Sequence, residues 1–210
     1  MSDEAAKYPL TILFGGSFDP VHWGHLHSAR AAMRELSATS VLFIPAHVSP
    51  HKTAGAKSGA EDRLNMLRLA IVNEPGFAIS ELELRRPPPS YTWETVRTLF
   101  KMRTGEEFVF LIGADQLSAF HKWKHVNELI KVVRFAILPR PGWEMPIAVP
   151  MGRSREMWRK FCPLHTADSP ISSTDIRQRV ANGQSIDALV PAAVRDYIVY
   201  RGLYRAVRGG

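Results

Sequence analysis

The chain has 210 residues, of which 45% are hydrophobic and 22% charged, so it can form one well-packed domain with at most a small appendage. Its net charge of +7 favours an anionic partner, either a nucleic acid or a small polyphosphate. The single cysteine, Cys162, excludes an intrachain disulfide and a multi-cysteine zinc site, and no apolar run reaches the roughly 20 residues that span a membrane.

Residues 1–9 lack the basic and apolar regions of a signal peptide, so we expect a flexible N-terminus and a cytoplasmic protein. Residues 10–14 form a short apolar run that is typical of a buried strand. Residues 25–36 repeat apolar side chains at helical spacing, which predicts a helix.

Between this strand and this helix lie two glycines, Gly15 and Gly16, and two histidines, His22 and His25. Glycine lets backbone N–H groups approach an anion closely, and a helix N-terminus favours negative charge. The stretch therefore predicts a phosphate-binding turn, although it matches neither the Walker A pattern nor the Gly-x-Gly-x-x-Gly fingerprint. The alternative is an ordinary strand-to-helix turn whose histidines are polar surface residues.

Four elements are predicted next along the chain. Residues 41–44 form a second buried strand, and the polar residues 46–59 form a long loop of the kind that is often functional. Residues 61–73 have the apolar spacing of an amphipathic helix. Residues 77–84 alternate between two faces, which predicts a strand near the edge of the sheet.

After a proline-rich break at residues 85–90, the predicted elements again alternate. They are a helix at 91–102, a central strand at 108–112, short helical pieces up to Val132, a strand at 134–138, a short strand at 164–167, and helices at 174–181 and 192–201. Ser172 and Asp175 fit a capping box for the first of the last two helices, and Asn182 with Gly183 marks its end. Residues 143–155 are rich in proline and glycine and have no clear assignment.

Strands that alternate with helices predict a three-layer α/β domain with a parallel sheet at residues 10–170, followed by a small helical C-terminal subdomain at 171–210. In such a sheet, ligands bind at the carboxyl ends of the strands, near the point where the strand order reverses. The loops after Phe14, Ile44 and Ile112 should therefore line one crevice.

Several stretches resemble one enzyme group. Residues 15–26, Gly-Gly-Ser-Phe-Asp-Pro-Val-His-Trp-Gly-His-Leu, resemble the His-x-Gly-His signature of the nucleotidyltransferase α/β-phosphodiesterase superfamily. Residues 171–177, Ile-Ser-Ser-Thr-Asp-Ile-Arg, resemble the C-terminal signature of the same group. Residues 44–52, 89–95 and 112–123 are similar to the bacterial nicotinate-nucleotide adenylyltransferases. The resemblance implies the Rossmann-like nucleotidyltransferase fold.

The implied reaction is transfer of AMP from ATP to nicotinate mononucleotide, which gives nicotinate adenine dinucleotide and pyrophosphate. The phosphate of the mononucleotide is already an anionic nucleophile, so neither a protein base nor a covalent intermediate is required. Catalysis then consists of bringing two anions together and stabilising charge on the α-phosphoryl group and the leaving pyrophosphate. Cations, N–H donors and helix N-termini are the groups that do this.

The resemblance also assigns roles by position. His22, His25 and Arg177 would be the catalytic residues, with the histidines on the ATP phosphates. The implied ATP-binding residues are Gly15, Gly16, Ser17, Phe18, His22, His25, Gly113, Asp115, Ser172, Ser173, Thr174 and Arg177. Without the family, the segment from Ser172 to Arg177 would be interpreted as a capped helix with a surface arginine, and a capping serine can also bind phosphate.

The implied substrate-binding residues are His51, Lys52, Tyr91, Thr92, Asp115 and Trp123. His51 and Lys52 would lie near the mononucleotide phosphate. The Trp123 indole would stack on the pyridine ring, and the Thr92 backbone N–H would meet its carboxylate. Taken alone, Trp123 would be assigned to the core, and Asp115 would be explained almost as well as a helix N-cap as by a bond to a ribose hydroxyl.

Magnesium is expected as a cofactor carried by ATP, because no cluster of carboxylates provides metal ligands. Asp19 is better explained as a turn-stabilising residue than as a metal ligand. The expected partners are ATP and nicotinate mononucleotide, with neither nucleic acid nor membrane, and the oligomeric state is open. The sequence departs from the family pattern at Trp23, a bulky residue between the two histidines.

Two alternatives compete with this interpretation. A sibling adenylyltransferase would use phosphopantetheine or the amidated mononucleotide, but phosphopantetheine enzymes tend to have threonine where this chain has His22. A basic α/β protein that binds nucleic acid and has lost catalysis would show salt-sensitive binding and no ATP turnover. The presence of His22, His25 and Arg177 argues against it.

Overall fold

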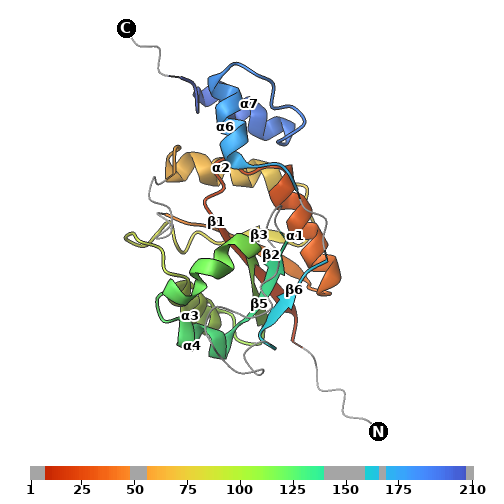
Figure 1. Cartoon of the computed structure of the whole chain (residues 1–210), viewed down its shortest axis with the longest axis vertical. Helices are drawn as coiled ribbons and strands as arrows, with labels where there is room; N and C mark the ends of the chain where they lie inside the picture. Colours follow the sequence, from red (N-terminus) through yellow and green to blue (C-terminus); the bar gives the residue numbers. More distant parts are fainter. Residues whose placement is uncertain (1–7, 48–55, 140–158, 166–168, 207–210) are drawn as a thin grey trace.

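The computed structural model describes residues 8–47, 56–139, 159–165 and 169–206. Its core is one sheet of six parallel strands in the order β3-β2-β1-β4-β5-β6 (Figure 1). The strands are β1 (Leu10–Gly16), β2 (Ser40–Pro45), β3 (Phe77–Ile79), β4 (Glu107–Gly113), β5 (Arg134–Leu138) and β6 (Phe161–Pro163). The helices are α1 (Trp23–Glu35), α2 (Ala60–Ile71), α3 (Thr92–Met102), the 3-10 helix η1 (Ala114–Lys122), α4 (Val126–Val132), α6 (Ser173–Ala181) and α7 (Ala192–Arg201).

Helices cover both faces of the sheet, as the alternation of strands and helices predicts. Along β1, Ile12 and Phe14 pack in the same hydrophobic cluster as α1 and α2, whereas Leu13 packs in the cluster of α3 and α4. Figure 1 accordingly shows α1 on one side of the sheet and α3 and α4 on the other. Because both faces are buried, the inner strands are continuous apolar runs rather than alternating ones. The predicted three-layer α/β fold is confirmed.

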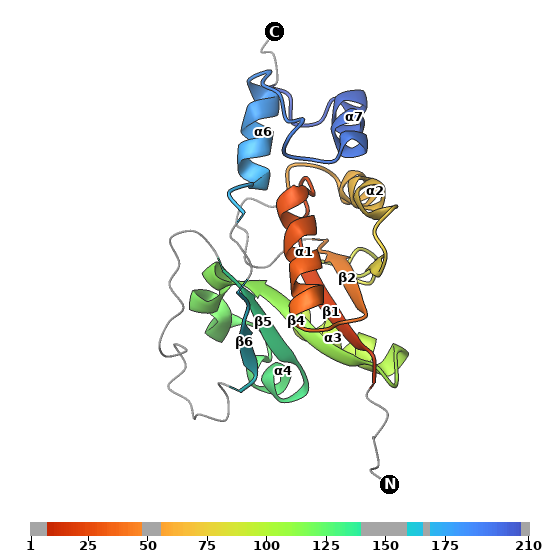
Figure 2. The ribbon, with the colours of Figure 1, turned by 90° about the vertical axis from the view of Figure 1, so that its right-hand side faces the viewer.

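The two C-terminal helices lie at one end of the molecule, next to α2 (Figure 2). Ile176 of α6 and Ile198 of α7 belong to the same hydrophobic cluster as β1 and α1. Ser172 accepts a hydrogen bond from Asp175 N at 3.1 Å, so the predicted N-cap is confirmed. Gly183, with φ of +70°, follows the last turn of α6 as the sequence predicts. The division at residue 170 stays a prediction.

Two predicted strands are wrong in extent. The strand predicted at 77–84 ends at Ile79, and a turn closed by the Arg85 N to Glu81 O bond follows it. The alternation beyond Ile79 is therefore not that of a strand: residues 80–84 are partly buried, and the one buried side chain among them is Glu83. β3 is nevertheless an edge strand, as expected.

The last strand, predicted at 164–167, lies at Phe161–Pro163 instead. β6 contains Pro163, and it is at the edge of the sheet, where proline is tolerated. The Phe161 ring stacks on Phe135 with centroids 5.3 Å apart and anchors the strand there. Residues 166 and 167 of the predicted strand lie outside the described residues, as does the unassigned stretch 143–155.

Candidate active site

A cavity of about 750 Å³ opens at the carboxyl ends of the central strands. It lies where the strand order reverses, because β1 pairs with β2 on one side and with β4 on the other. Gly15, Ala46 and Gly113, which follow or end β1, β2 and β4, all line it, so the predicted shared crevice is confirmed. From the predicted site set, the lining includes Gly15, Gly16, Ser17, Phe18, His22, His25, Thr92, Gly113, Asp115, Trp123, Ser172, Ser173, Thr174 and Arg177.

Of the predicted site residues that the structure describes, Tyr91 is the one outside this lining. The Tyr91 ring lies 4.1 Å from the Lys124 ammonium nitrogen, and Tyr91 is the N-cap residue of α3. His51 and Lys52 lie outside the described residues, so their predicted contact with the mononucleotide phosphate stays a prediction.

The two histidines lie face to face at the start of α1. His22 is the N-cap residue and is only 4% exposed, and His25 is one helical turn further on. Their ring centroids are 3.7 Å apart with the planes inclined by 30°. The Phe18 ring packs edge-on against His25 at 5.1 Å. Both rings line the cavity at the start of α1, and a helix N-terminus is an end that favours negative charge.

The glycine between the histidines is required by close packing. A Cβ atom on Gly24 would lie 2.6 Å from Ser169 Oγ and 3.0 Å from the His22 ring. A Cβ atom on Gly16 would lie 2.9 Å from the Phe18 ring. Both contacts are too short, so larger residues would displace the side chains that form the cavity wall.

Trp23, the unusual residue between the histidines, lies away from the cavity. Its backbone N–H donates to Leu189 O at 3.0 Å, and its ring stacks on His27 with centroids 5.8 Å apart. A bulky residue at this position therefore does not enter the cavity beside the predicted phosphate-binding turn.

The start of α6 is bound to the loop between β1 and α1. Arg177 Nη1 donates to Asp19 O at 2.7 Å, and Ser173 Oγ donates to Pro20 O at 2.9 Å. Arg177 Nη2 also donates to Thr174 Oγ1 at 3.1 Å. The two signature stretches, about 150 residues apart in sequence, thus form opposite sides of one cavity.

Trp123 is a core residue that also faces the cavity, and its stacking on a pyridine ring stays a prediction. It is 7% exposed and packs against Phe120 at 5.0 Å, so it belongs to the core. It also lines the cavity, together with Thr92 at the start of α3. Asp115 lies in the first turn of η1 and is exposed, while Gly113 is the N-cap residue, so the alternative of an N-cap role for Asp115 is wrong.

Comparisons with known proteins agree with this geometry. Residues 13–179 match the cytidylyltransferase-like family. A protein of Geobacillus thermodenitrificans (strain NG80-2) that is named "Probable nicotinate-nucleotide adenylyltransferase" is 41% identical over 92% of this chain and 85% of its own length. A protein of the same name from Yersinia pestis (strain Pestoides F) is 36% identical over 98% of this chain and 100% of its own. The chain belongs to the nicotinate-nucleotide adenylyltransferase family.

Solved structures show the same fold. The Plasmodium falciparum nicotinic acid mononucleotide adenylyltransferase in complex with NaAD matches with a TM-score of 0.73 at 18% identity, over 94% of this chain and 98% of that one. The same enzyme in complex with APC matches with a TM-score of 0.72. The predicted nucleotidyltransferase fold is confirmed.

In this member of the adenylyltransferase family, Asp19 joins three distant segments. The side chain is 3% exposed, and its carboxylate accepts hydrogen bonds from Lys57 N at 2.6 Å, Ser58 N at 3.2 Å and Tyr204 Oη at 2.7 Å. Burial alone would raise the pKa of Asp19, but the bonds from Ser58, Tyr204 and Lys57 and the charge of Arg177 hold the pKa below its usual value. The sequence predicts that Asp19 stabilises its own turn, but the bonds of its carboxylate run to distant segments of the chain instead.

The Asp19 carboxylate should make stability depend on pH. Its pKa in the folded protein lies below the usual 3.8, so its contribution is present above that value and is lost as the pH falls through the folded pKa. We expect Asp19→Asn to lower the free energy of unfolding by about 1–3 kcal/mol at neutral pH, because the donors on Lys57, Ser58 and Tyr204 lose a charged, buried acceptor. The difference in the free energy of unfolding between Asp19→Asn and the wild type should become smaller below pH 4.

Urea unfolding between pH 3 and pH 7 measures this effect. Asp196→Asn is the matched control, since Asp196 is exposed. This variant should show the same dependence of the free energy of unfolding on pH as the wild type. A difference between Asp19→Asn and wild type that stays constant over the whole pH range would contradict the prediction.

Arg63 is a residue of the cavity loops that sequence reasoning missed. This α2 side chain is 1% exposed, and its Nη1 donates to Ser17 O at 2.9 Å and to Ala46 O at 2.7 Å. Its Nη2 donates to His47 O at 3.1 Å. Burial lowers the pKa of Arg63, and the Asp19 carboxylate and Tyr204 oppose that shift. One guanidinium therefore holds the backbone of the loops after β1 and β2.

Glu83 is the second missed residue, and it lines the cavity while only 7% exposed. It lay in the stretch predicted as an alternating edge strand, where an acidic residue between two leucines is assigned to solvent. No pattern in the sequence distinguishes a buried arginine or glutamate from an exposed one at the same spacing.

Among the described residues, no group of three His, Cys, Asp or Glu side chains could hold a metal ion. Within the same residues, no helix is both long and apolar enough to cross a membrane.

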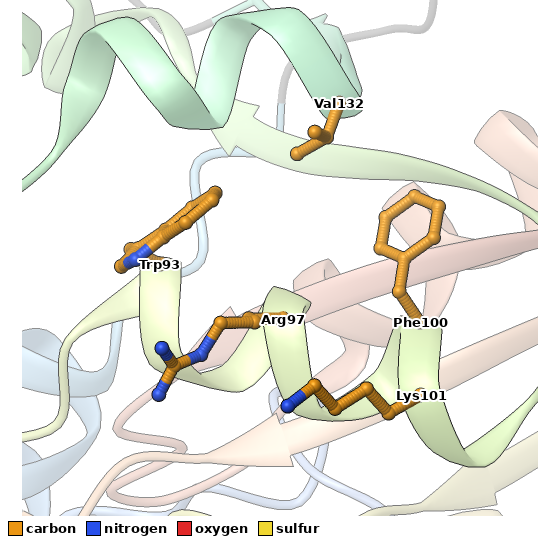
Figure 3. A pocket seen from close by; sticks show the side chains of 5 residues that line it. All are labelled: Trp93, Arg97, Phe100, Lys101 and Val132. Carbon is orange, nitrogen blue, oxygen red and sulfur yellow. The ribbon is translucent and has the colours of Figure 1, made fainter.

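A second pocket, of about 410 Å³, lies between α3 and the end of α4 (Figure 3). It is lined by Trp93, Arg97, Phe100, Lys101 and Val132 and includes none of the predicted site residues.

Proposed function

We propose that this member of the nicotinate-nucleotide adenylyltransferase family transfers AMP from ATP to nicotinate mononucleotide by direct attack of one phosphate on another. The observation that carries the proposal is that the His-x-Gly-His stretch and the Ser172–Arg177 stretch meet in one cavity at the carboxyl ends of the strands. Both stretches place a helix start on that cavity, which suits a triphosphate held between them.

The proposed step makes one bond and breaks one. An oxygen of the mononucleotide phosphate attacks the α-phosphorus of ATP in line with the bond to the β-phosphate. The new P–O bond gives nicotinate adenine dinucleotide, and the electron pair of the broken bond leaves with pyrophosphate. The attacking oxygen is already ionised, so no proton has to move.

The residues of the chain then act by position and charge. The rings of His22 and His25, at the positive end of α1, are suited to stabilise the charge that develops on the α-phosphoryl oxygens. The start of α6, with Arg177, is suited to the charge of the leaving pyrophosphate. The histidines are charge stabilisers in this mechanism and not acid–base catalysts.

The second substrate would bind at the side of the cavity formed by Thr92 and Trp123. There the indole can stack on a pyridine ring, and the helix start can receive a carboxylate. Magnesium, which we expect, would arrive with ATP and be held by phosphate oxygens and water. Binding to neither nucleic acid nor membranes, and a cytoplasmic location, stay predictions.

Pyrophosphate release from ATP, with nicotinate mononucleotide and with its amide assayed side by side, tests the proposal. We expect release with the acid and much slower release with the amide, and nicotinate adenine dinucleotide as the second product. Release with neither nucleotide would refute the enzymatic function. Preference for the amide would refute the choice of substrate.

A further inference from the structure

Glu83 is an acidic side chain buried in the wall of the active-site cavity, and the mechanism above gives it no role. It lies on the turn after β3, and it shares the cavity wall with Ser90 and Thr92. A buried carboxyl group is costly unless its oxygens accept hydrogen bonds, so the identity of its partners indicates what it does.

The partners of Glu83 stand on either side of the start of α3. Thr95 Oγ1, inside the first turns of the helix, donates to Glu83 Oε1 at 2.7 Å. The Ser90 hydroxyl, one residue before the N-cap Tyr91, also hydrogen-bonds the Glu83 carboxylate. Tyr91 makes no side-chain capping bond. Glu83 therefore holds in place a helix start that has no cap of its own.

Ser90 and Thr95 also form hydrogen bonds with other residues, and these connect them to the loop after β2. Ser90 Oγ accepts a hydrogen bond from His47 N at 3.1 Å, and the His47 ring Nδ1 lies 3.1 Å from Arg86 O. Arg86 also donates from Nη2 to Thr95 Oγ1. Because Glu83 binds both Ser90 and Thr95, it is the common point of a network that joins this loop to the start of α3.

This helix start is where the second substrate is proposed to bind. The first N–H groups of a helix have no partner inside the helix, so their direction decides what ligand they can meet. The position of these groups depends on the residues on either side, Ser90 and Thr95, and both are bound to Glu83. The bonds described for Glu83 reach neither the loop between β1 and α1 nor α6, where ATP is proposed to bind.

We propose that Glu83 is a positioning residue for the pyridine nucleotide: its carboxyl group fixes Ser90 and Thr95 and so aims the first N–H groups of α3 at the substituent of the pyridine ring. This inference rests on the proposed function, because it assigns the second substrate to the start of α3. It predicts that loss of Glu83 weakens binding of nicotinate mononucleotide and leaves ATP binding intact.

Three variants test this assignment. Glu83→Ala should raise the KM and the Kd for nicotinate mononucleotide about 10- to 100-fold, because hydrogen bonds to a charged acceptor are lost on both sides of the helix start. The KM for ATP should change less than about twofold. Glu83→Gln keeps an acceptor oxygen in the same place and should restore most of the affinity. Glu81→Ala, which removes a partly exposed carboxylate two residues away, should behave as wild type.

Thr95→Val is a second test of the inference, which remains usable if Glu83→Ala fails to fold. It keeps the carboxylate and the shape of the helix but removes one link, so it should raise the same KM by a smaller factor of about 3 to 10. Melting temperatures of all variants are measured alongside. An unchanged KM and Kd for the mononucleotide in both Glu83→Ala and Thr95→Val would overturn the inference. An equal rise in the KM for ATP, or a Glu83→Gln variant as defective as Glu83→Ala, would also overturn it.

Calorimetric titration with nicotinate mononucleotide separates this inference from the proposed function. Wild-type protein that binds the mononucleotide, loses that binding in Glu83→Ala and yet releases no pyrophosphate would refute the reaction but support the role of Glu83. Wild-type protein that turns over normally, with unchanged binding in Glu83→Ala, would refute the role of Glu83 alone. Wild-type protein that fails to bind the mononucleotide would refute both.

Discussion

Replacing His22 or His25 by alanine is expected to lower kcat by about 100-fold or more, the cost of losing one donor to a developing oxyanion. Both rings line the cavity, and their centroids are 3.7 Å apart at the start of α1. Two residues that act on one transition state are not additive, so the double variant should lose little more than either single variant.

Initial rates at saturating ATP and mononucleotide measure this effect. His27→Ala is the matched control, since His27 lies on α1, is exposed and stacks on Trp23 away from the cavity. It should retain wild-type kcat. Near-normal turnover in both single variants would show that the histidines are ordinary polar residues of a strand-to-helix turn.

Replacing Arg63 by methionine is expected to lower the free energy of unfolding by about 3–5 kcal/mol. Methionine fills much of the same volume, but the backbone oxygens of Ser17, Ala46 and His47 lose their buried donor. In a protein of this size the loss corresponds to a fall of about 10 °C in Tm. Because those oxygens belong to both loops of the cavity, kcat/KM should fall as well.

Arg68→Met is the control for this substitution. Arg68 lies on the same helix, but its side chain is 54% exposed and forms a surface ion pair with Glu81. Such pairs contribute about 0–1 kcal/mol, so this variant should unfold close to wild type. If thermal denaturation shows that Arg63→Met and Arg68→Met lower the Tm equally, the buried contacts of Arg63 are not what stabilises the loops.

The sequence was sufficient to predict the fold because the central strands are buried on both faces. Residues 108–112 are a continuous apolar run, and they lie in β4 between β1 and β5. Prediction failed at the edges, where a strand is held by few contacts. β3 has three residues, and β6 is held by the stacking of Phe161 on Phe135, which no spacing in the sequence reveals.

The site was predictable where its residues lie in short motifs. The two histidines are one helical turn apart, and Ser172 to Arg177 lie at a single helix start. The local helix therefore fixes the relative positions of the residues within each motif. Residues that act over long distances were not predictable. Arg63 and Glu83 have ordinary positions in a helix and a turn, and only the folded chain shows that they are buried between loops.

The hydrogen bond between Tyr204 and Asp19 has a consequence for the biosynthesis of the protein. The two residues are 185 positions apart, and a ribosome that adds roughly 5–20 residues per second needs about 10–40 s to pass from one to the other. During that time, a nascent chain has both histidines and the glycines beside them but lacks Tyr204, one of the donors that hold their loop. The loop between β1 and α1 is therefore among the first parts of the enzyme to be translated and among the last to be completed.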